Sequence, residues 1–323
     1  MSKNLSQQVV LDRRGFVAAT FATVAGLGLA GCSDTSAEAD KGSAAGSSKS
    51  SEDTEASTTL DAKAFDKLVD NGPKADDDVI AASTWATAVK DAGVFKIGGV
   101  QTSTLFSLLN EKDGQTRGFD AGIAQLLSNY ILGENKVEIT QVTSDTRESV
   151  LQNGQVDAVF ATYTITDERK KLVSFAGPYY YTQQAILVLT DNDDIKGVDD
   201  LANKNVAVQS GSNGPAILEE FAPKASQQEF KTDEEAARYQ AQINDKAVNN
   251  RVYTSSDASA AHLMAGSKEP YGIGLPLDSD GVAFVNDFLK KIEDDGTWTE
   301  LWQICIGDRT GDTNVPELPE IGA

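Results

Sequence analysis

Histidine and cysteine, the residues most versatile in catalysis and metal binding, are nearly absent from this chain. Histidine occurs once, as His262, and cysteine twice, as Cys32 and Cys305. The cysteine and histidine clusters that hold zinc cannot be built from so few ligands, and no nucleophile stands beside a base in the sequence. His262 lies in an alanine- and leucine-rich stretch that favours a helix, so we interpret it as structural. The sequence therefore predicts no metal site, no cofactor and no catalytic residue.

Positive charge is also scarce, since 28 Lys and Arg stand against 49 Asp and Glu, for a formal net charge of −21. A surface of this sign repels the phosphates of nucleic acids and the headgroups of anionic lipids. Nucleic acid is therefore excluded as a partner. Any anionic ligand must be bound by a local cluster of donors and not by the overall field of the protein.

The apolar stretch over residues 17–30 is too short to cross a bilayer as a helix. It follows the pair Arg13-Arg14 and ends in Leu-Ala-Gly-Cys at Cys32, an order typical of export signals. Residues 1–32 are therefore predicted to be a signal peptide. The paired arginines resemble a twin-arginine signal, and the end resembles a bacterial lipobox in which the cysteine is lipidated. A buried apolar helix is the alternative.

These features predict an extracytoplasmic protein anchored to the cell membrane as a lipoprotein through Cys32. Lipidation of Cys32 would leave Cys305 without a partner for an intrachain disulfide, and its apolar surroundings predict a small buried hydrophobic residue. Residues 33–59 contain no aromatic or large aliphatic residue, which predicts a disordered tether. We expect N-terminal helices over residues 60–94 and a C-terminal tail over residues 307–323.

Between these regions, strand-like and helix-like patterns alternate, which predicts the α/β class with largely parallel sheets. Such sheets bind ligands at the carboxyl ends of their strands. Strands are expected at residues 95–100, 137–142, 156–160, 185–189, 205–208, 227–230 and 269–275, and helices at residues 119–132, 146–152, 215–221, 233–242, 280–294 and 298–303.

Residues 159–171 read as a strand, a tight turn and the start of a helix. Thr166 is a typical N-cap residue, and helix N-termini offer unpaired N–H donors to anions. The hydroxyls of Thr162 and Thr164 and the guanidinium of Arg169 could converge on one anion at this turn. A cation in the first helical turn opposes the helix dipole, so Arg169 needs a compensating anionic partner. The alternative is a solvated basic helix face.

A second turn of the same kind covers residues 209–214, a run of small and polar residues before a helix that starts near Pro215. Proline at the helix start and glycine in the turn suit an N-terminus that faces an anion. An ordinary strand-to-helix turn explains the pattern equally well.

Several motifs stand in the order and approximate spacing of the polar amino-acid-binding proteins of ABC importers, solute-binding protein family 3. They include Gly118-Phe119-Asp120, Thr164 to Lys171, Phe175 to Tyr180, Ser210-Gly211-Ser212 and Glu269 to Gly274. The resemblance spans about residues 83–306. It implies two α/β lobes with the amino acid clamped between them.

In this family two segments cross between the lobes, here near residues 182–186 and 268–272. The resemblance thus implies a lobe 1 of residues 95–184 and 271–306 and a lobe 2 of residues 185–270. The chain departs from the family where the distance from Asp257 to Tyr271 is shorter than in relatives. We therefore expect residues 235–269 to lack a strand.

The resemblance implies that Arg169 and Thr164 bind the α-carboxylate of the ligand. The backbone carbonyl at Thr162 would accept from the α-ammonium group. The remaining implied contacts are Ser212 and Asn213, for the carboxylate, and Asp257, for the ammonium.

The side chain of the ligand would face Ser144 and Arg147, which match positions where glutamate- and aspartate-binding relatives hold the second carboxylate. Those relatives also have a basic residue where this chain has Gln101. A buried carboxylate needs nearly full charge compensation, whereas a glutamine shares hydrogen bonds with an amide. Ser144 and Arg147 thus favour glutamate and Gln101 favours glutamine, and we expect glutamate as the ligand. The alternative for Arg147 is a surface residue that pairs with Glu148 or Asp145.

The resulting hypothesis is a monomeric, non-enzymatic protein that captures a polar amino acid and delivers it to an ABC transporter permease. Two other classes stay open. Because a few proteins of this family are dehydratases, one alternative is an extracytoplasmic enzyme. The other is a sensor protein that presents its ligand to a partner.

Overall fold

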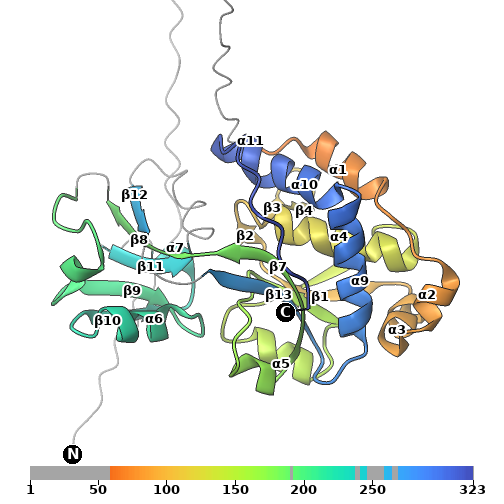
Figure 1. The fold of residues 1–323 in the computed structure, drawn as a ribbon, viewed down its shortest axis with the longest axis horizontal. Helices are drawn as coiled ribbons and strands as arrows, with labels where there is room; N and C mark the ends of the chain where they lie inside the picture. Colours follow the sequence, from red (N-terminus) through yellow and green to blue (C-terminus); the bar gives the residue numbers. More distant parts are fainter. Residues whose placement is uncertain (1–58, 190–191, 237–240, 246–257, 264–267, 323) are drawn as a thin grey trace, which may run out of the picture. The chain divides into compact units, whose positions relative to one another are not determined.

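The computed structural model describes residues 59–322, except residues 190–191, 237–240, 246–257 and 264–267 (Figure 1). The predicted signal peptide, the lipidation site Cys32, nearly all of the predicted tether and Asp257 lie outside the described residues. Within the described ranges, no helix has the length and apolar character needed to cross a membrane.

The first lobe is built on a sheet with the strand order β5-β1-β6-β13-β7. β1 pairs in parallel with β5 and β6, as the alternating pattern predicted, whereas β13 is antiparallel to both of its neighbours. The carboxyl ends of β5, β1 and β6 consequently lie at one edge of the sheet. The strands are β1 (Phe95–Gly99), β5 (Val137–Gln141), β6 (Ala158–Phe160), β7 (Ser174–Thr182) and β13 (Glu269–Leu275).

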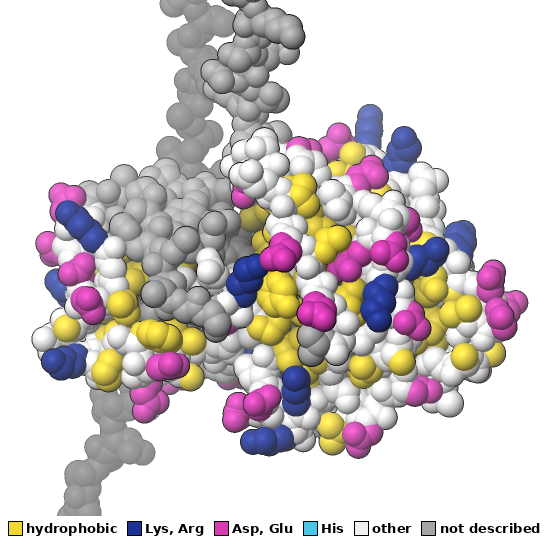
Figure 2. All heavy atoms as spheres, in the orientation of Figure 1, with side chains coloured by type: hydrophobic (Ala, Val, Ile, Leu, Met, Phe, Trp, Pro, Cys, Tyr) yellow, Lys and Arg dark blue, Asp and Glu magenta, His cyan; other side chains and the backbone are white. Residues whose placement is uncertain are grey.

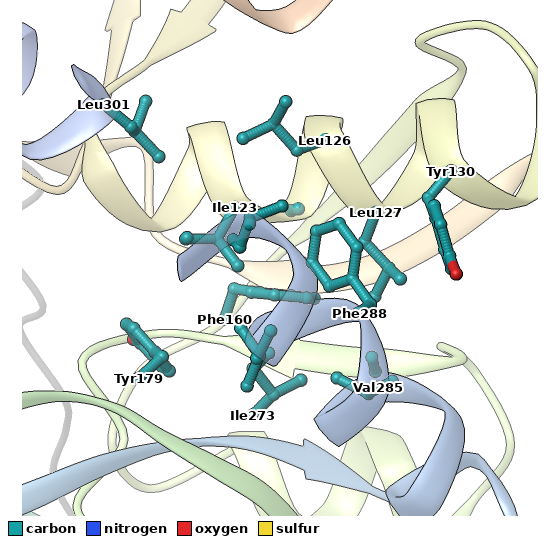
Figure 3. Packing of buried hydrophobic residues seen from close by; sticks show 14 of the residues in the cluster. Ile123, Leu126, Leu127, Tyr130, Phe160, Tyr179, Ile273, Val285, Phe288 and Leu301 are labelled. Atoms are coloured by element: carbon teal, nitrogen blue, oxygen red, sulfur yellow. The ribbon is translucent and has the colours of Figure 1, made fainter. Parts of the chain in front are cut away.

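Helices cover this sheet and bury the main hydrophobic core. In Figure 3, Ile123 and Leu127 of α4 and Phe288 of α9 lie over Phe160 and Ile273 of the sheet, and all five side chains are fully buried. Because every residue of α4 from Phe119 to Ile131 is buried, this helix forms the centre of the lobe. The helices are α4 (Phe119–Leu132), α5 (Arg147–Gln152), α9 (Gly281–Asp294) and α10 (Thr297–Trp302).

The predicted N-terminal helices are present and pack onto the same core. They are α1 (Ala62–Asp70), α2 (Asp77–Ala81) and α3 (Thr84–Ala92). The carboxylate of Asp280 accepts hydrogen bonds from the backbone N–H groups of Thr84 (2.6 Å) and Trp85 (3.0 Å), which caps α3 from the loop before α9. Arg117 donates to both carboxylate oxygens of Asp66, at 2.7 and 2.8 Å, and so fixes α1 to β4.

A small antiparallel sheet of order β2-β3-β4 was not predicted from the sequence. Its strands are short and mostly polar, so they carry no clear period of two. They are β2 (Thr102–Ser103), β3 (Ser107–Asn110) and β4 (Gln115–Arg117).

The second lobe has its own sheet, of order β10-β9-β11-β8-β12, and its own small core. β9 is parallel to β10 and β11, and β8 is antiparallel to β11 and β12. The elements are β8 (Gln184–Leu189), β9 (Asn205–Gln209), α6 (Gly214–Phe221), β10 (Ser226–Phe230), α7 (Asp233–Ala236), β11 (Ala241–Asp245) and β12 (Ala258–Leu263).

The region after β10 corrects the sequence prediction. The helix expected over residues 233–242 ends at Ala236, and residues 241–245 form β11. The prediction that residues 235–269 lack a strand is also wrong, because β11 and β12 both lie there. His262 belongs to β12 and not to a helix. Ala241 and Ile243 alternate with polar residues, a strand pattern that the helix-forming residues before it obscured.

Two segments connect the lobes. The first runs from β7, which ends at Thr182, into β8, which starts at Gln184, and the second leads into β13. The two segments pair at Glu269 and Thr182, so they are hydrogen-bonded neighbours.

The C-terminal tail follows a π-helical turn (Gln303–Gly307) and α11 (Asp308–Thr310). Cys305 in the π-helical turn is buried, as predicted from its apolar surroundings. The N–H of Gly322 donates to the carbonyl of Gly177 at 2.8 Å. Near the second connecting segment, Lys268 forms an ion pair with Glu317 at 3.0 Å.

Candidate functional site

A small cavity of about 110 Å³ lies where strand ends of both lobes meet. In lobe 1 the residues that follow β1, β5 and β6 line it, and in lobe 2 the residues at the ends of β9 and β10 do so. This is the position expected for a ligand of parallel sheets. The lining residues are Val100, Thr102, Gln141, Val142, Thr143, Ser144, Ala161, Thr162, Gln209, Lys231 and Thr232.

Arg169 is a buried side chain at the contact between the lobes, and it does not line this cavity. Its Nη1 donates to the carbonyl of Thr164 at 2.8 Å, and its Nη2 donates to the carbonyl of Gly211 in lobe 2 at 3.0 Å. The side chains of Lys170 and Lys171 are exposed. The alternative of a solvated basic face therefore describes these two lysines but is wrong for Arg169.

The helix expected after Thr166 is only a single 3₁₀ turn, Arg169–Lys171. Thr166 still acts as a cap, because its Oγ1 accepts from the N–H of Arg169 at 3.2 Å. A turn of this length has little dipole, so the prediction that a helix N-terminus after Thr166 attracts an anion is wrong. The donor group at this position is the guanidinium of Arg169 itself.

Arg147 is the second buried guanidinium, at the start of α5. It donates to the carbonyl of Ala161 at 3.2 Å and to that of Gly211 at 3.4 Å. The guanidinium carbon lies 4.0 Å from the centroid of the Tyr163 ring, and that of Arg169 lies 5.2 Å from the same centroid. Both arginines thus contact one aromatic ring and one carbonyl of the opposite lobe.

Glu148 and Tyr163 complete this cluster; the sequence suggested Glu148 only as a surface partner of Arg147 and gave no role to Tyr163. Oε1 of Glu148 lies 3.9 Å from Nε of Arg147 and 3.8 Å from Nε of Arg169, and it accepts a hydrogen bond from the Tyr163 hydroxyl at 2.6 Å. Burial, together with this carboxylate, raises the pKa of Tyr163 well above its usual value. The hydroxyl therefore stays a donor and holds Glu148 against the arginines.

The turn that contains Thr162 is held by a buried carboxylate. The N–H of Thr162 donates to Oδ2 of Asp120 at 2.7 Å, and the hydroxyl of Tyr179 donates to Oδ1 of Asp120 at 2.7 Å. Thr162 adopts a positive φ of 44°, an uncommon conformation for a β-branched residue. Thr164, two residues on, is buried and forms a β-bridge with Tyr271.

The turn of lobe 2 makes both local and distant contacts. The hydroxyl of Ser212 donates to the carbonyl of Gln209 at 2.6 Å and accepts from the N–H of Gly214 at 3.0 Å, so it caps α6. Nδ2 of Asn213 donates to Oε2 of Glu269 at 2.9 Å. These two predicted ligand residues are therefore engaged by protein groups in this structure.

The lobes contact each other directly through the same turn. Oγ of Ser144 donates to Oε1 of Gln209 at 3.2 Å, and Oγ of Ser210 donates to Oδ2 of Asp145 at 2.5 Å. Nε2 of Gln209 donates in turn to the carbonyl of Lys231 at 3.1 Å. Gln209 also lines the cavity. The sequence placed it in the predicted turn at residues 209–214 but gave no signal for its contact with Ser144.

Gln101 does not line the cavity, although its neighbours Val100 and Thr102 do. Its Nε2 donates to Oγ1 of Thr116 at 3.0 Å, which ties it to the small sheet of lobe 1. Of the predicted site residues, Ser144 and Thr162 line the cavity. Arg147 and Arg169 do not line it but meet at the carbonyl of Gly211, which directly precedes Ser212 and Asn213. In the described part of the chain, no three His, Cys, Asp or Glu side chains form a group that could hold a metal ion.

Comparisons with known proteins agree with this architecture. The ABC transporter glutamine-binding protein GlnH of Bacillus subtilis is 37% identical over 68% of this chain and 83% of its own length. Glutamate-binding protein GluB of Corynebacterium glutamicum is 29% identical over 62% of this chain and 74% of its own.

Among solved structures, the ancestral amino acid-binding protein AncCDT-1, a precursor of cyclohexadienyl dehydratase, is 32% identical with a TM-score of 0.61. The match covers 68% of this chain and 98% of that protein. The sequence profile of the bacterial extracellular solute-binding proteins, family 3, matches residues 95–307, which span both lobes. The chain belongs to the bacterial extracellular solute-binding proteins, family 3.

Proposed function

We propose that this protein captures a free amino acid between its two lobes and delivers it to the permease of an ABC importer. The observation that carries the proposal is that two buried guanidiniums, from Arg147 and Arg169, reach from lobe 1 to the same Gly211 carbonyl of lobe 2. Buried arginines at a contact between lobes are suited to carboxylate ligands, because each offers a planar fork of donors.

In this proposal the ligand's α-carboxylate is bound by Arg169 and Thr164, and the turn of Ser212 and Asn213 contacts it from lobe 2. A ligand that touches both lobes has more contacts in the closed arrangement than in an open one. Binding therefore shifts the population toward closure, and the closed form is the one presented to the permease.

We propose glutamate as the preferred ligand, because Arg147, three residues after the cavity-lining Ser144, is a second buried guanidinium that could take a second carboxylate. Glutamine is the second candidate. It is favoured by the name of the Bacillus subtilis relative and by the neutral Gln101, which is held by Thr116 at the margin of the site.

Isothermal titration calorimetry on the purified folded part tests the core of the proposal. Arg169→Ala should weaken binding by about 2–5 kcal/mol, since it leaves a desolvated carboxylate without its partner, which corresponds to about 30-fold or more in Kd. Arg169→Lys should not restore affinity, because a point charge lacks the planar fork. Lys171→Ala, an exposed cation of the same turn, is the matched control and should bind like the wild type. Equal affinities of wild type and Arg169→Ala would contradict the proposal.

A competition titration between glutamate and glutamine decides the ligand. If glutamate is preferred, Arg147→Ala should cost glutamate more affinity than glutamine, and Gln101→Arg should tighten glutamate. A wild-type preference for glutamine, or for a basic or aliphatic amino acid, would refute the acidic ligand while leaving amino-acid capture intact.

The enzymatic alternative is supported by the resemblance to AncCDT-1, a precursor of a dehydratase. Binding and turnover are separated by product analysis on the sample used for calorimetry. We expect the bound amino acid to be recovered unchanged. Recovery of a dehydrated or deaminated product in proportion to the protein would establish an enzyme instead.

We further propose that the protein acts outside the cytoplasm as a lipoprotein. Mass spectrometry of the membrane fraction should find an acylated Cys32 at the mature N-terminus, and Cys32→Ala should abolish this modification. A native-host protein that still begins at Met1 would refute the anchor.

A further inference from the structure

A second cavity, of about 240 Å³, lies between the two connecting segments and the C-terminal tail. The first connecting segment lines it with residues 180–183, and the second lines it with Lys268. Trp302 of α10 forms another part of the wall, and the tail completes it with residues that include Asp312 and Glu317. None of these residues lines the smaller cavity between the lobes, so the two cavities are separate.

Aromatic rings and carboxylates form much of the wall of this second cavity. The carboxylates are those of Asp312 and Glu317. Against these two acids, the described lining holds one cationic side chain, that of Lys268, so negative charge is in excess. The rings are those of Tyr180, Tyr181 and Trp302.

An ammonium group of the protein itself already lies against this wall. Nζ of Lys268 is 5.6 Å from the centroid of the Tyr181 ring and 3.0 Å from Oε2 of Glu317. An aromatic face attracts an organic cation through its quadrupole, and a carboxylate attracts it through its charge. Because 56% of the Lys268 side chain is exposed, this ammonium contacts the cavity from its edge and leaves the interior open.

Asp312 supplies the second carboxylate of the cavity. Its Oδ1 accepts hydrogen bonds from the backbone N–H and from Nδ2 of Asn314, at 3.0 and 3.2 Å, which hold the carboxylate in place. Burial raises the pKa of Tyr180 to about 12, and the charge of Asp312 acts in the same direction. The carboxylate therefore lies close enough to the Tyr180 hydroxyl to act on a charge in the cavity.

The size and charge of the cavity exclude other classes of ligand. Drug-sized ligands occupy pockets of about 300–1,000 Å³, so a cavity of about 240 Å³ suits a smaller molecule. The excess of carboxylates disfavours an anion, and the net charge of −21 attracts cations to the whole protein. A metal ion is not favoured either, since no three His, Cys, Asp or Glu side chains of the described residues form a group that could hold one.

We propose that this cavity is a second binding site, for a small organic ammonium ion. The ammonium group of the ligand would lie against the aromatic wall, with Asp312 as its carboxylate partner. Lys268 would compete with the ligand, because its own ammonium already lies over Tyr181 and beside Glu317. The site would contact both connecting segments, and it does not depend on which amino acid is bound between the lobes.

Isothermal titration calorimetry of the purified protein with choline chloride tests the site, with sodium chloride keeping the ionic strength constant. The uncharged analogue of choline, in which a carbon atom replaces the nitrogen, has the same shape and measures the effect of the charge alone. The variants are Tyr181→Leu, Asp312→Asn and Lys268→Met. Glu320→Gln is the matched control, because Glu320 is an exposed acid of the same tail that does not line the cavity.

We expect choline to bind in a saturable manner and the uncharged analogue to bind about 10-fold more weakly or less. Tyr181→Leu should weaken choline binding about 2- to 30-fold, the range of one cation–π contact, and Asp312→Asn should weaken it by up to about 5-fold. Lys268→Met should instead tighten choline binding, because it removes the competing ammonium. Glu320→Gln should bind choline like the wild type.

Three results would overturn the inference: no saturable binding of choline, equal affinity for the uncharged analogue, or equal losses in Asp312→Asn and Glu320→Gln. A loss of choline affinity in Lys268→Met would also overturn it, because the lysine would then support the cavity and not compete for it. Stoichiometric displacement of choline by glutamate or glutamine would place choline between the lobes and would equally contradict a second site. Because Asp312 is exposed, its variant keeps the test valid even where Tyr181→Leu fails to fold.

Discussion

Gly211 offers the sharpest test of whether the contact between the lobes belongs to the ligand-bound state. Its carbonyl accepts hydrogen bonds from Arg169 and Arg147. A Cβ at this position would lie 2.8 Å from the backbone N of Asp145 and 2.8 Å from the carbonyl carbon of Ser144, both in the other lobe. Distances below 3.0 Å are not tolerated, so Gly211→Ala must push the two lobes apart at this point.

Gly211→Ala is expected to have two effects, one on the free energy of unfolding and one on the affinity for the ligand. Gly211 has a φ of +68°, so alanine costs about 1–2 kcal/mol of folding stability whether the lobes are open or closed. The collision acts only when the lobes meet. It should remove at least one charged hydrogen bond, worth about 1.5–3 kcal/mol, which corresponds to roughly a 10- to 100-fold loss of affinity.

Gly154→Ala is a closely matched control. Gly154 has a φ of +64°, and a Cβ there would meet nothing within 4 Å. It should therefore lose a similar amount of stability and no affinity. Urea denaturation gives the stability of both variants, calorimetry gives the affinity for the preferred amino acid, and small-angle X-ray scattering at saturating ligand reports whether the lobes close.

A Gly211→Ala variant that binds within about 2-fold of the wild type and gives the same scattering curve with ligand would refute a contact at Gly211 in the ligand-bound state. That result would mean that the turn at residues 209–211 and the segment at residues 144–147 are not in contact when ligand is bound. An equal loss of affinity in Gly154→Ala would also contradict it, because the effect would then follow backbone strain and not the contact between lobes.

The remaining predictions concern the first lobe. Leu127→Ala removes a fully buried side chain of α4 and should lower the free energy of unfolding by about 2–5 kcal/mol in urea titrations, whereas the exposed Leu172→Ala should change it little. Arg117→Ala removes the contacts to Asp66 and Asp113 and should lower the free energy of unfolding by about 1–2 kcal/mol. In limited proteolysis, this variant should be cleaved around α1 earlier than the control Lys112→Ala. Burial, with a smaller effect from the charge of Asp294, raises the pKa of Glu293 to about 7, so the folded state holds a proton that the unfolded state releases near pH 4.5. Stability should therefore fall as the pH rises from about 5 to 7, and Glu293→Gln should flatten this fall when urea midpoints are measured at each pH.

Much of the fold could be predicted because its long elements carry clear periodicity. α4 and α9 repeat apolar residues at helical spacing, and β1 and β5 alternate apolar with polar residues over their first three positions. The short polar strands β2 to β4 gave no such signal. Residues 241–245 follow helix-forming residues, and only their pairing with β8 and β9 makes them a strand.

The candidate site divides in a similar way. Thr164, Arg169 and the turn at residues 209–214 stand in recognisable motifs, so the sequence identified them. The contacts of Tyr163 with Glu148, of Ser144 with Gln209 and of Asn213 with Glu269 were not predicted, because each joins segments that lie apart in the sequence. Spacing along a chain cannot show such pairs without the geometry of both lobes.

The acidic side chains scattered over the surface drawn in Figure 2 fit the net charge of −21 and contrast with the buried arginine pair. Because exposed charges are screened within about 8 Å at physiological ionic strength, Arg147 and Arg169 act on their own surroundings and not through the overall field. Added salt should therefore weaken ligand binding far less than it weakens a surface ion pair.

The C-terminal tail has a practical consequence for laboratory work on this protein. Gly322 is hydrogen-bonded to Gly177, and Glu317 pairs with Lys268 next to a segment that connects the lobes. A purification tag or fluorescent fusion joined after Ala323 would start two residues beyond Gly322, close to the segments that connect the lobes. Fusions placed ahead of Leu60 avoid it, and affinities measured with a C-terminal tag should be compared with those of the tag-free chain.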